Sequence, residues 1–190
     1  YYATGLLCNM SRGFSLIEVL VMSAIVATFS VALILNFRSS PKSGVARNQV
    51  ASIIVSDIRR AQSLATSGAR FQGNIVCGYG VHYVNQNSYL IYAKSVPSPS
   101  SCSSISNYNY QIGNPIIETK YISNSNMEMR SAVLDVFYEP PNPRVYINNN
   151  SAINGSPTSI YIQLKGQQNC STAPCAQISI FPSGQINLTN

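Results

Sequence analysis

The chain has 190 residues, of which 12 are Lys or Arg and 6 are Asp or Glu, so its formal net charge is +6. Only 9% of the residues are charged, and a low-charge surface rich in Ser, Asn and Tyr suits a domain that packs beside others or faces the outside. The single histidine, His82, and the absence of a CxxC pair argue against a zinc site.

The first long feature is an apolar run that ends at Phe37. Only Ser23, Thr28 and Ser30 interrupt it before Asn36, and such hydroxyls are tolerated in membrane helices because they bond back to helix carbonyls. The run is long enough to span a bilayer. A cleaved secretory signal fits less well, because its apolar core should be shorter and should end in a small-x-small site. We therefore expect a retained transmembrane helix over residues 14–37.

Glu18 lies near the head of this run. A carboxylate inside a membrane span costs about 2.5–3.5 kcal/mol at a central position, so it should have a partner or a function. On a helix, Phe14 and Glu18 lie one turn apart on the same face. The simpler alternative is that Glu18 only complements the helix dipole in the first turn, but this leaves the preceding Gly13 and Phe14 unexplained.

The string GFSLIEVLV resembles the cleavage and methylation signature shared by type IV pilins, type II secretion pseudopilins and competence pilins. The resemblance implies that a membrane prepilin peptidase cuts between Gly13 and Phe14 and that the new amino terminus of Phe14 is N-methylated. It also implies that Glu18 guides subunit assembly. Residues 1–13 would then be the prepilin leader, with Met10 a candidate true start.

The charges that flank the apolar run do not fix its orientation, since Arg12 precedes it and Arg38, Lys42 and Arg47 follow it. The resemblance implies a single-pass protein of the inner (cytoplasmic) membrane with a periplasmic or extracellular C-terminal domain. It also implies three kinds of partner: other pilins or pseudopilins in a filament, the prepilin peptidase and inner-membrane lipid.

A linker and a second helix are expected within residues 38–68. Apolar residues recur with a helical period from Val50 to Ala65, and Gly68 is a natural terminator. This amphipathic helix should continue the membrane helix outward and lay its apolar stripe on a sheet. The segment VSDIRRAQSLA resembles the corresponding helix of the minor pseudopilin H and FimT/FimU-like group.

Residues 69–190 are dominated by short β-branched and aromatic runs separated by Asn, Ser, Gly and Pro, which predicts a β domain. The resemblance implies that this domain is extracytoplasmic. Turn residues at 85–87 and 182–184 suit hairpins. The expected fold class is α+β and pilin-like: a long N-terminal helix, half membrane-spanning and half amphipathic, packed on an antiparallel β domain of one or two sheets. The predicted strands are 74–77, 79–84, 89–93, 116–122, 132–138, 144–147, 159–165, 177–181 and 185–188.

The cysteines that follow the leader form an even set. Four cysteines allow three pairings, and proximity along the chain favours Cys77 with Cys102 and Cys170 with Cys175 without settling the choice. Such bridges persist only in an oxidising compartment, which agrees with an exported domain.

Enzymatic function is not expected, and neither is a cofactor or a metal. His82 has no Ser/His/Asp arrangement around it, no glycine-rich phosphate loop follows a strand, and the acidic residues show no recognisable pairing. The positive net charge is compatible with nucleic acid, and competence pilins bind DNA. The basic residues are nevertheless scattered, without a basic run interleaved with aromatic residues, so DNA is not the favoured partner.

The favoured function is that of a structural subunit. It would be a minor pseudopilin or minor pilin that is processed by the prepilin peptidase and assembled into a type II secretion pseudopilus or a type IV pilus. The alternative is a pilin-like tip or competence protein that uses the helix as a tether and whose β domain binds DNA or a surface ligand. The long loops at 95–110, 139–143 and 148–158 are read as surface connections, and the alternative is that they contact neighbouring subunits or a substrate.

Overall fold

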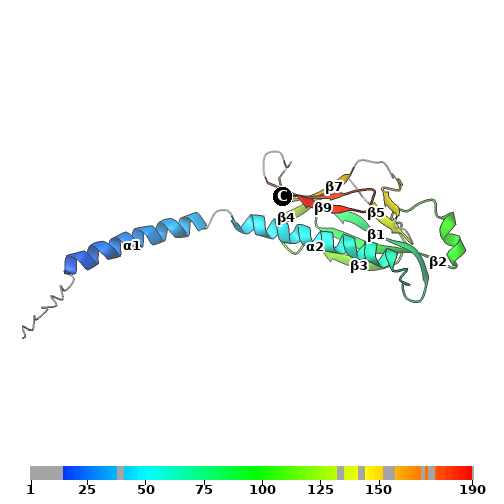
Figure 1. Cartoon of the computed structure of the whole chain (residues 1–190), viewed down its shortest axis with the longest axis horizontal. Helices are drawn as coiled ribbons and strands as arrows, with labels where there is room; N and C mark the ends of the chain where they lie inside the picture. Colours follow the sequence, from blue (N-terminus) through cyan, green and yellow to red (C-terminus); the bar gives the residue numbers. More distant parts are fainter. Residues whose placement is uncertain are drawn as a thin grey trace, which may run out of the picture. The chain divides into compact units, whose positions relative to one another are not determined.

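The computed structural model describes residues 15–37, 41–131, 135–140, 144–151, 157–167, 170 and 174–189. The chain divides into two compact units, Tyr1–Pro41 and Lys42–Asn190. Figure 1 shows helix α1 in the first unit and a second helix lying along β-sheets in the other. The fold is therefore α+β, as expected.

Helix α1 (Leu16–Phe37) lies in the first unit. It begins after Ser15, whose side-chain oxygen accepts a 3.3 Å hydrogen bond from the backbone N–H of Glu18, as an N-cap residue does. Its segment Leu16–Leu33 is long and apolar enough to cross a membrane. The prediction of an apolar helix here is confirmed, and the predicted cleavage site, Gly13 and Phe14, lies outside the described residues.

Helix α2 (Pro41–Thr66) lies within residues 38–68, as expected, but it begins at Pro41, so residues 41–44 are helical although their Pro and Gly favoured a break before Val45. Proline is favoured at the first position of a helix because its fixed φ suits the helix and its missing N–H is not needed there. At the other end, the N–H of Gly68 bonds to the Ala65 carbonyl and that of Ala69 to the Leu64 carbonyl. Gly68 takes a φ of 60°, which completes a Schellman cap.

The β strands form two antiparallel sheets. The five-stranded sheet has the order β3-β2-β1-β5-β6, and the four-stranded sheet has the order β4-β7-β8-β9. Residues 99–104 form a short 3-10 helix between β2 and β3. The strands are β1 (Ile75–Asn85), β2 (Ser88–Val96), β3 (Ile116–Tyr121), β4 (Met127–Ser131), β5 (Asp135–Glu139), β6 (Arg144–Ile147), β7 (Thr158–Leu164), β8 (Ala176–Ile180) and β9 (Ile186–Thr189).

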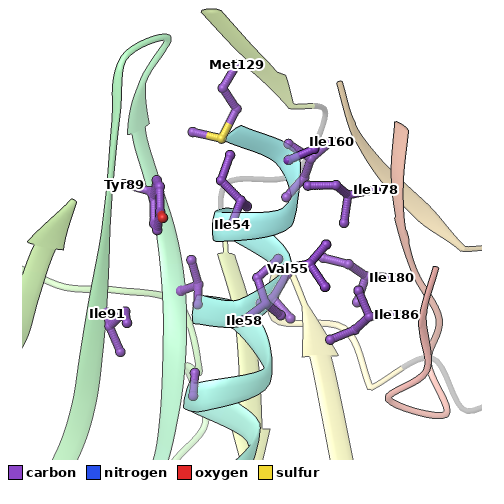
Figure 2. Close-up of a cluster of buried hydrophobic side chains, with 14 of the residues drawn as sticks. Ile54, Val55, Ile58, Tyr89, Ile91, Met129, Ile160, Ile178, Ile180 and Ile186 are labelled. Atoms are coloured by element: carbon purple, nitrogen blue, oxygen red, sulfur yellow. The ribbon is translucent and has the colours of Figure 1, made fainter. Parts of the chain in front are cut away.

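The main core lies where α2 meets both sheets. Figure 2 shows Ile54, Val55 and Ile58 of α2 facing side chains from each sheet. Ile58 has no exposed surface, and burying a side chain of this size contributes about 1.5–3 kcal/mol. The predicted apolar stripe of this helix is thus confirmed. The residues facing it are Tyr89 and Ile91 from the five-stranded sheet and Ile160, Ile178, Ile180 and Ile186 from the four-stranded sheet.

Two details of the strand prediction were wrong. The segments 74–77 and 79–84 belong to one strand, β1, which carries a register shift between Val76 and Tyr79; the glycine between them marks a bulge rather than a break. Strand β4 was missed because its sequence, MEMRS, contains no β-branched or aromatic residue. Its two methionines are nevertheless buried and alternate with Glu128 and Arg130. The predicted hairpin turns at 85–87 and 182–184 are present.

Candidate assembly site and polar clusters

The candidate assembly residue, Glu18, lies in the first turn of α1. Its backbone N–H bonds to the backbone and side-chain oxygens of Ser15, so the start of the helix is fixed locally. The side chain of Glu18 is exposed, and within the described part of the chain its carboxylate takes no hydrogen bond or ion pair. It therefore remains available to a cation outside the described residues.

The surface of α1 around Glu18 is apolar on every side. Each described side chain from Ser15 to Leu33 is exposed. The hydroxyls of Ser23, Thr28 and Ser30 donate to carbonyls one turn back, at 2.9, 2.8 and 2.7 Å, so they present no unsatisfied donor. A helix that is apolar all round requires an apolar environment, such as lipid or other apolar helices.

A buried hydrogen bond ties α2 to the five-stranded sheet. The Tyr89 hydroxyl donates to Asp57 Oδ2 at 2.6 Å, and both side chains are buried. Burial, together with the hydrogen bond to Asp57 and its negative charge, raises the pKa of the Tyr89 hydroxyl well above its usual value. The pair supplies the partner that a carboxylate on the apolar stripe of α2 requires.

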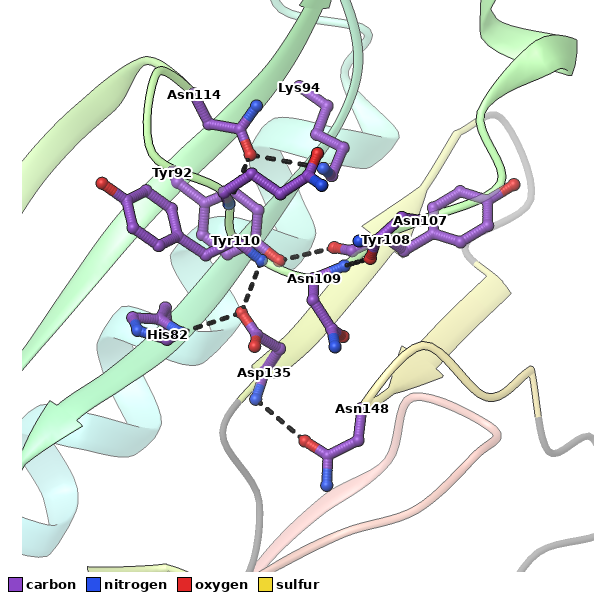
Figure 3. Close-up of polar contacts among 11 residues, drawn as sticks. His82, Tyr92, Lys94, Asn107, Tyr108, Asn109, Tyr110, Asn114, Asp135 and Asn148 are labelled. Carbon is purple, nitrogen blue, oxygen red and sulfur yellow. Dashed lines mark hydrogen bonds and ion pairs between the residues drawn. The ribbon is translucent and has the colours of Figure 1, made fainter.

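A second polar cluster fastens the loop that follows the 3-10 helix onto the outer face of the five-stranded sheet (Figure 3). Asp135 Oδ1 accepts the backbone N–H of Tyr110 at 2.8 Å and lies 3.0 Å from His82 Nδ1. The His82 ring lies 4.8 Å from the Tyr110 ring, centroid to centroid. Asn148 accepts a 3.2 Å bond from the Asp135 backbone N–H. His82 is thus a strand residue that pairs with a buried carboxylate.

The same loop covers a small aromatic core. Tyr92 donates a 2.7 Å hydrogen bond to the Tyr108 carbonyl, and the Tyr108 ring stacks on Tyr146 at 3.7 Å between centroids. Phe137 is fully buried beside them. The loop at 95–110, expected to be only a surface connection, therefore packs on the sheet in its second half.

Several basic side chains form ion pairs or hydrogen bonds within the second unit. Arg60 and Lys120 both pair with Glu118, at 2.7 and 2.6 Å. Arg47 is buried and donates to the Pro174 carbonyl at 2.7 Å. Lys94 is buried beside Asn114, and this burial lowers its pKa. These basic side chains therefore take part in contacts within the second unit, and such contacts do not by themselves favour a continuous basic surface.

Both disulfides favoured by chain proximity are present. Cys77 is bonded to Cys102 and Cys170 to Cys175, with Cα atoms 5.3 and 5.4 Å apart. The first joins β1 to the 3-10 helix, and the second closes a short loop before β8. Disulfides persist in oxidising compartments, which agrees with an exported domain.

Removing the two bridges should cost different amounts. Cys77 and Cys102 are separated by 25 residues, and Cys170 and Cys175 by 5. Loop-closure entropy then gives about 3.5 kcal/mol for the first bridge and about 2 kcal/mol for the second. We expect urea unfolding of the C77S/C102S double variant to show the larger loss. A larger loss in C170S/C175S would contradict this prediction.

The buried tyrosines predict loss of stability at high pH. Burial raises the pKa of six tyrosines in the folded state: Tyr79, Tyr83, Tyr89, Tyr92, Tyr138 and Tyr146. Above the usual tyrosine pKa of about 10, the unfolded chain releases these protons while the folded chain retains them, so stability falls as the pH rises. Each hydroxyl that keeps its proton in the fold contributes a slope of about 1.4 kcal/mol per pH unit once its unfolded counterpart is ionised. Urea unfolding at several pH values from 9 to 11 measures it.

Tyr138→Phe is the matched variant for this slope. The Tyr138 hydroxyl is buried without a hydrogen-bond partner in the described structure. Its removal should leave stability at pH 7 unchanged or raise it by up to about 1 kcal/mol. It should also reduce the alkaline slope by about 1.4 kcal/mol per pH unit, the contribution of one group. An unchanged slope would show that this hydroxyl does not retain its proton in the fold.

The described residues contain no group of three or more His, Cys, Asp or Glu side chains that could hold a metal ion.

The sequence did not indicate which residues pair with Asp57 and Asp135, because their partners lie far away along the chain. Asp57 and Tyr89 are 32 residues apart, and His82 and Asp135 are 53 residues apart.

Comparison with protein-family models, with curated proteins and with solved structures gives no match for this chain.

Proposed function

We propose that the chain is a structural subunit, a minor pseudopilin or minor pilin. The prepilin peptidase would cut it between Gly13 and Phe14, and it would assemble through α1 into a type II secretion pseudopilus or a type IV pilus. This proposal rests on the resemblance of residues 13–21 to the prepilin signature and on one structural observation: the carboxylate of Glu18 lies on an apolar helix and pairs with no described residue.

The carboxylates of the second unit, α2 and the β domain together, all have partners, and this sets Glu18 apart. The chain has six Asp and Glu residues. Five lie in this unit, and each has a hydrogen-bond or ion-pair partner there. Glu18 is the sixth, and no described residue pairs with its carboxylate. The five carboxylates are those of Asp57, Glu118, Glu128, Asp135 and Glu139.

A filament would supply a positively charged partner for the Glu18 carboxylate. Cleavage before Phe14 creates an ammonium group at the head of α1, one turn from Glu18. In a packed filament, the Glu18 carboxylate can neutralise the ammonium of a neighbouring subunit, which offsets the cost of burying both charges in an apolar environment. The apolar helices of neighbouring subunits would cover the rest of α1.

Photo-crosslinking through α1 tests this proposal. Val26 is 63% exposed on the apolar helix, so a photo-reactive amino acid at this position should capture an adjacent helix in the filament. We expect adducts with another pilin-class protein in cells with an active prepilin peptidase and none in cells with an inactive one. Adducts with lipid alone in both strains would contradict the proposal.

A further inference from the structure

The outer edge of β9 is open. In the sheet order β4-β7-β8-β9, no described strand lies beyond β9. The Phe181 N–H bonds to the Gln185 carbonyl, and the next pairs are Ile180 with Ile186 and Ser179 with Asn187. Hydrogen-bonded and non-hydrogen-bonded pairs alternate in antiparallel sheets. The N–H and C=O groups of Ile186 and, two residues on, Leu188 therefore point away from β8, toward the open edge.

The other sheet edges carry charged side chains, but β9 does not. Glu118 and Lys120 lie on β3, Glu128 and Arg130 on β4, and Arg144 on β6. Charges on an edge strand discourage further strand pairing. The β9 sequence, INLT, contains no charge. Among the described strands, β9 therefore has the edge that is least protected against an added strand.

A groove between β9 and α2 runs beside this edge. It has a volume of about 300 Å³ and is lined by Leu188 of β9 and by residues of α2. Val55 is buried and Leu188 half-buried, so they provide an apolar floor. Arg59 is exposed and forms no ion pair with any described carboxylate. The α2 residues that line the groove are Ser52, Val55, Ser56 and Arg59.

We infer that β9 and this groove bind an extended peptide segment of a partner protein, which adds a strand to β9 and places a carboxylate against Arg59. Backbone hydrogen bonds to Ile186 and Leu188 would provide affinity. Alternate side chains would enter the groove and provide specificity. A second copy of this chain fits less well, because it would bring another Arg59 and a further net charge of +6 to the same edge. The inference does not depend on the function proposed for α1.

A short synthetic peptide tests the inference on the full chain in detergent micelles. The probe is acetyl-Val-Thr-Val-Thr-Asp-Thr-amide, in which the two Val and the Asp share one face of a strand. We expect binding to slow amide hydrogen exchange at Ile186 and Leu188 by at least tenfold. The amides of Asn187 and Thr189 should change little, because they already bond to β8.

The charge requirement is tested with two neighbouring arginines. Arg59→Ala should weaken binding of the Asp peptide at least fivefold and leave binding of the same peptide with Asn in place of Asp unchanged. Arg60→Ala is the control, because Arg60 pairs with Glu118 and does not line the groove. Equal effects of the two variants, or equal effects of Arg59→Ala on the two peptides, would overturn the assignment of the carboxylate to Arg59.

Leu188→Pro tests the edge itself. Proline removes an N–H that points away from β8, a position at which edge strands tolerate it, so the thermal unfolding temperature should fall only slightly while peptide binding is lost. Retained binding would overturn the inference. Slow exchange of the Ile186 and Leu188 amides in the free chain would also overturn it, since the edge would then be covered within the chain. Protection that rises with protein concentration would identify a second copy as the occupant.

Discussion

Glu18→Ala is expected to yield a chain that is processed normally but is reduced at least tenfold in the filament fraction. The reason is that the substitution leaves the ammonium of a neighbouring subunit without its counter-charge. An uncompensated charge in an apolar span costs about 2.5–3.5 kcal/mol, and about 1.4 kcal/mol corresponds to a factor of ten. Quantitative immunoblots of membrane and filament fractions measure the effect, and mass spectrometry of the N-terminus confirms processing.

Two variants on the same helix provide the controls. Glu18→Asp keeps the negative charge on a shorter side chain, so it should retain part of the incorporation. Ser23→Ala removes only a hydroxyl that bonds to the Leu20 carbonyl of its own helix, so it should assemble like the natural chain. Normal incorporation of Glu18→Ala would contradict the assembly role of the carboxylate.

Gly80→Ala is expected to destabilise the β domain by about 3 kcal/mol. A Cβ atom at Gly80 would lie 2.6 Å from the Tyr92 ring, which is too close for any real contact. The ring is fully buried, and its hydroxyl is held by the Tyr108 carbonyl. It therefore moves only if the aromatic core and the loop above it shift, and overpacking of this kind typically costs about 1–3 kcal/mol. Urea unfolding of the full chain in detergent measures the loss.

Gly44→Ala is the matched control for this experiment. Gly44 lies within α2, and a Cβ atom there would meet only the Arg47 side chain, at 3.9 Å. Alanine in a helix is favoured over glycine by about 0.5–1 kcal/mol, so the control should be neutral or stabilising. If Gly80→Ala lost no more stability than this control, the aromatic core would be looser than its geometry indicates.

The helices were predictable from the sequence because their signals are local. The apolar run identified α1, and the helical period with a terminal glycine identified α2. Strand β4 was not predictable, because its burial depends on α2 and β7 rather than on its own propensity. The charged residues Glu128 and Arg130 alternate with two buried methionines, so the segment did not have the composition of a buried strand.

The polar clusters and the groove were less predictable, because tertiary pairing creates them. Nothing near Asp135 in the sequence indicates that it fastens the loop at Tyr110 and contacts His82. The open edge of β9 likewise follows from strand order and register, which the sequence of the strand does not encode alone. The disulfide partners, by contrast, were correctly favoured by proximity along the chain.

The central claim is that this chain is a processed filament subunit, and the N-terminus of the protein isolated from its native membrane tests it most directly. Mass spectrometry of that material should show a chain that begins at Phe14 and carries an N-methyl group. Peptides that run uncut through Arg12, Gly13 and Phe14, in cells whose prepilin peptidase processes its other substrates, would contradict the claim.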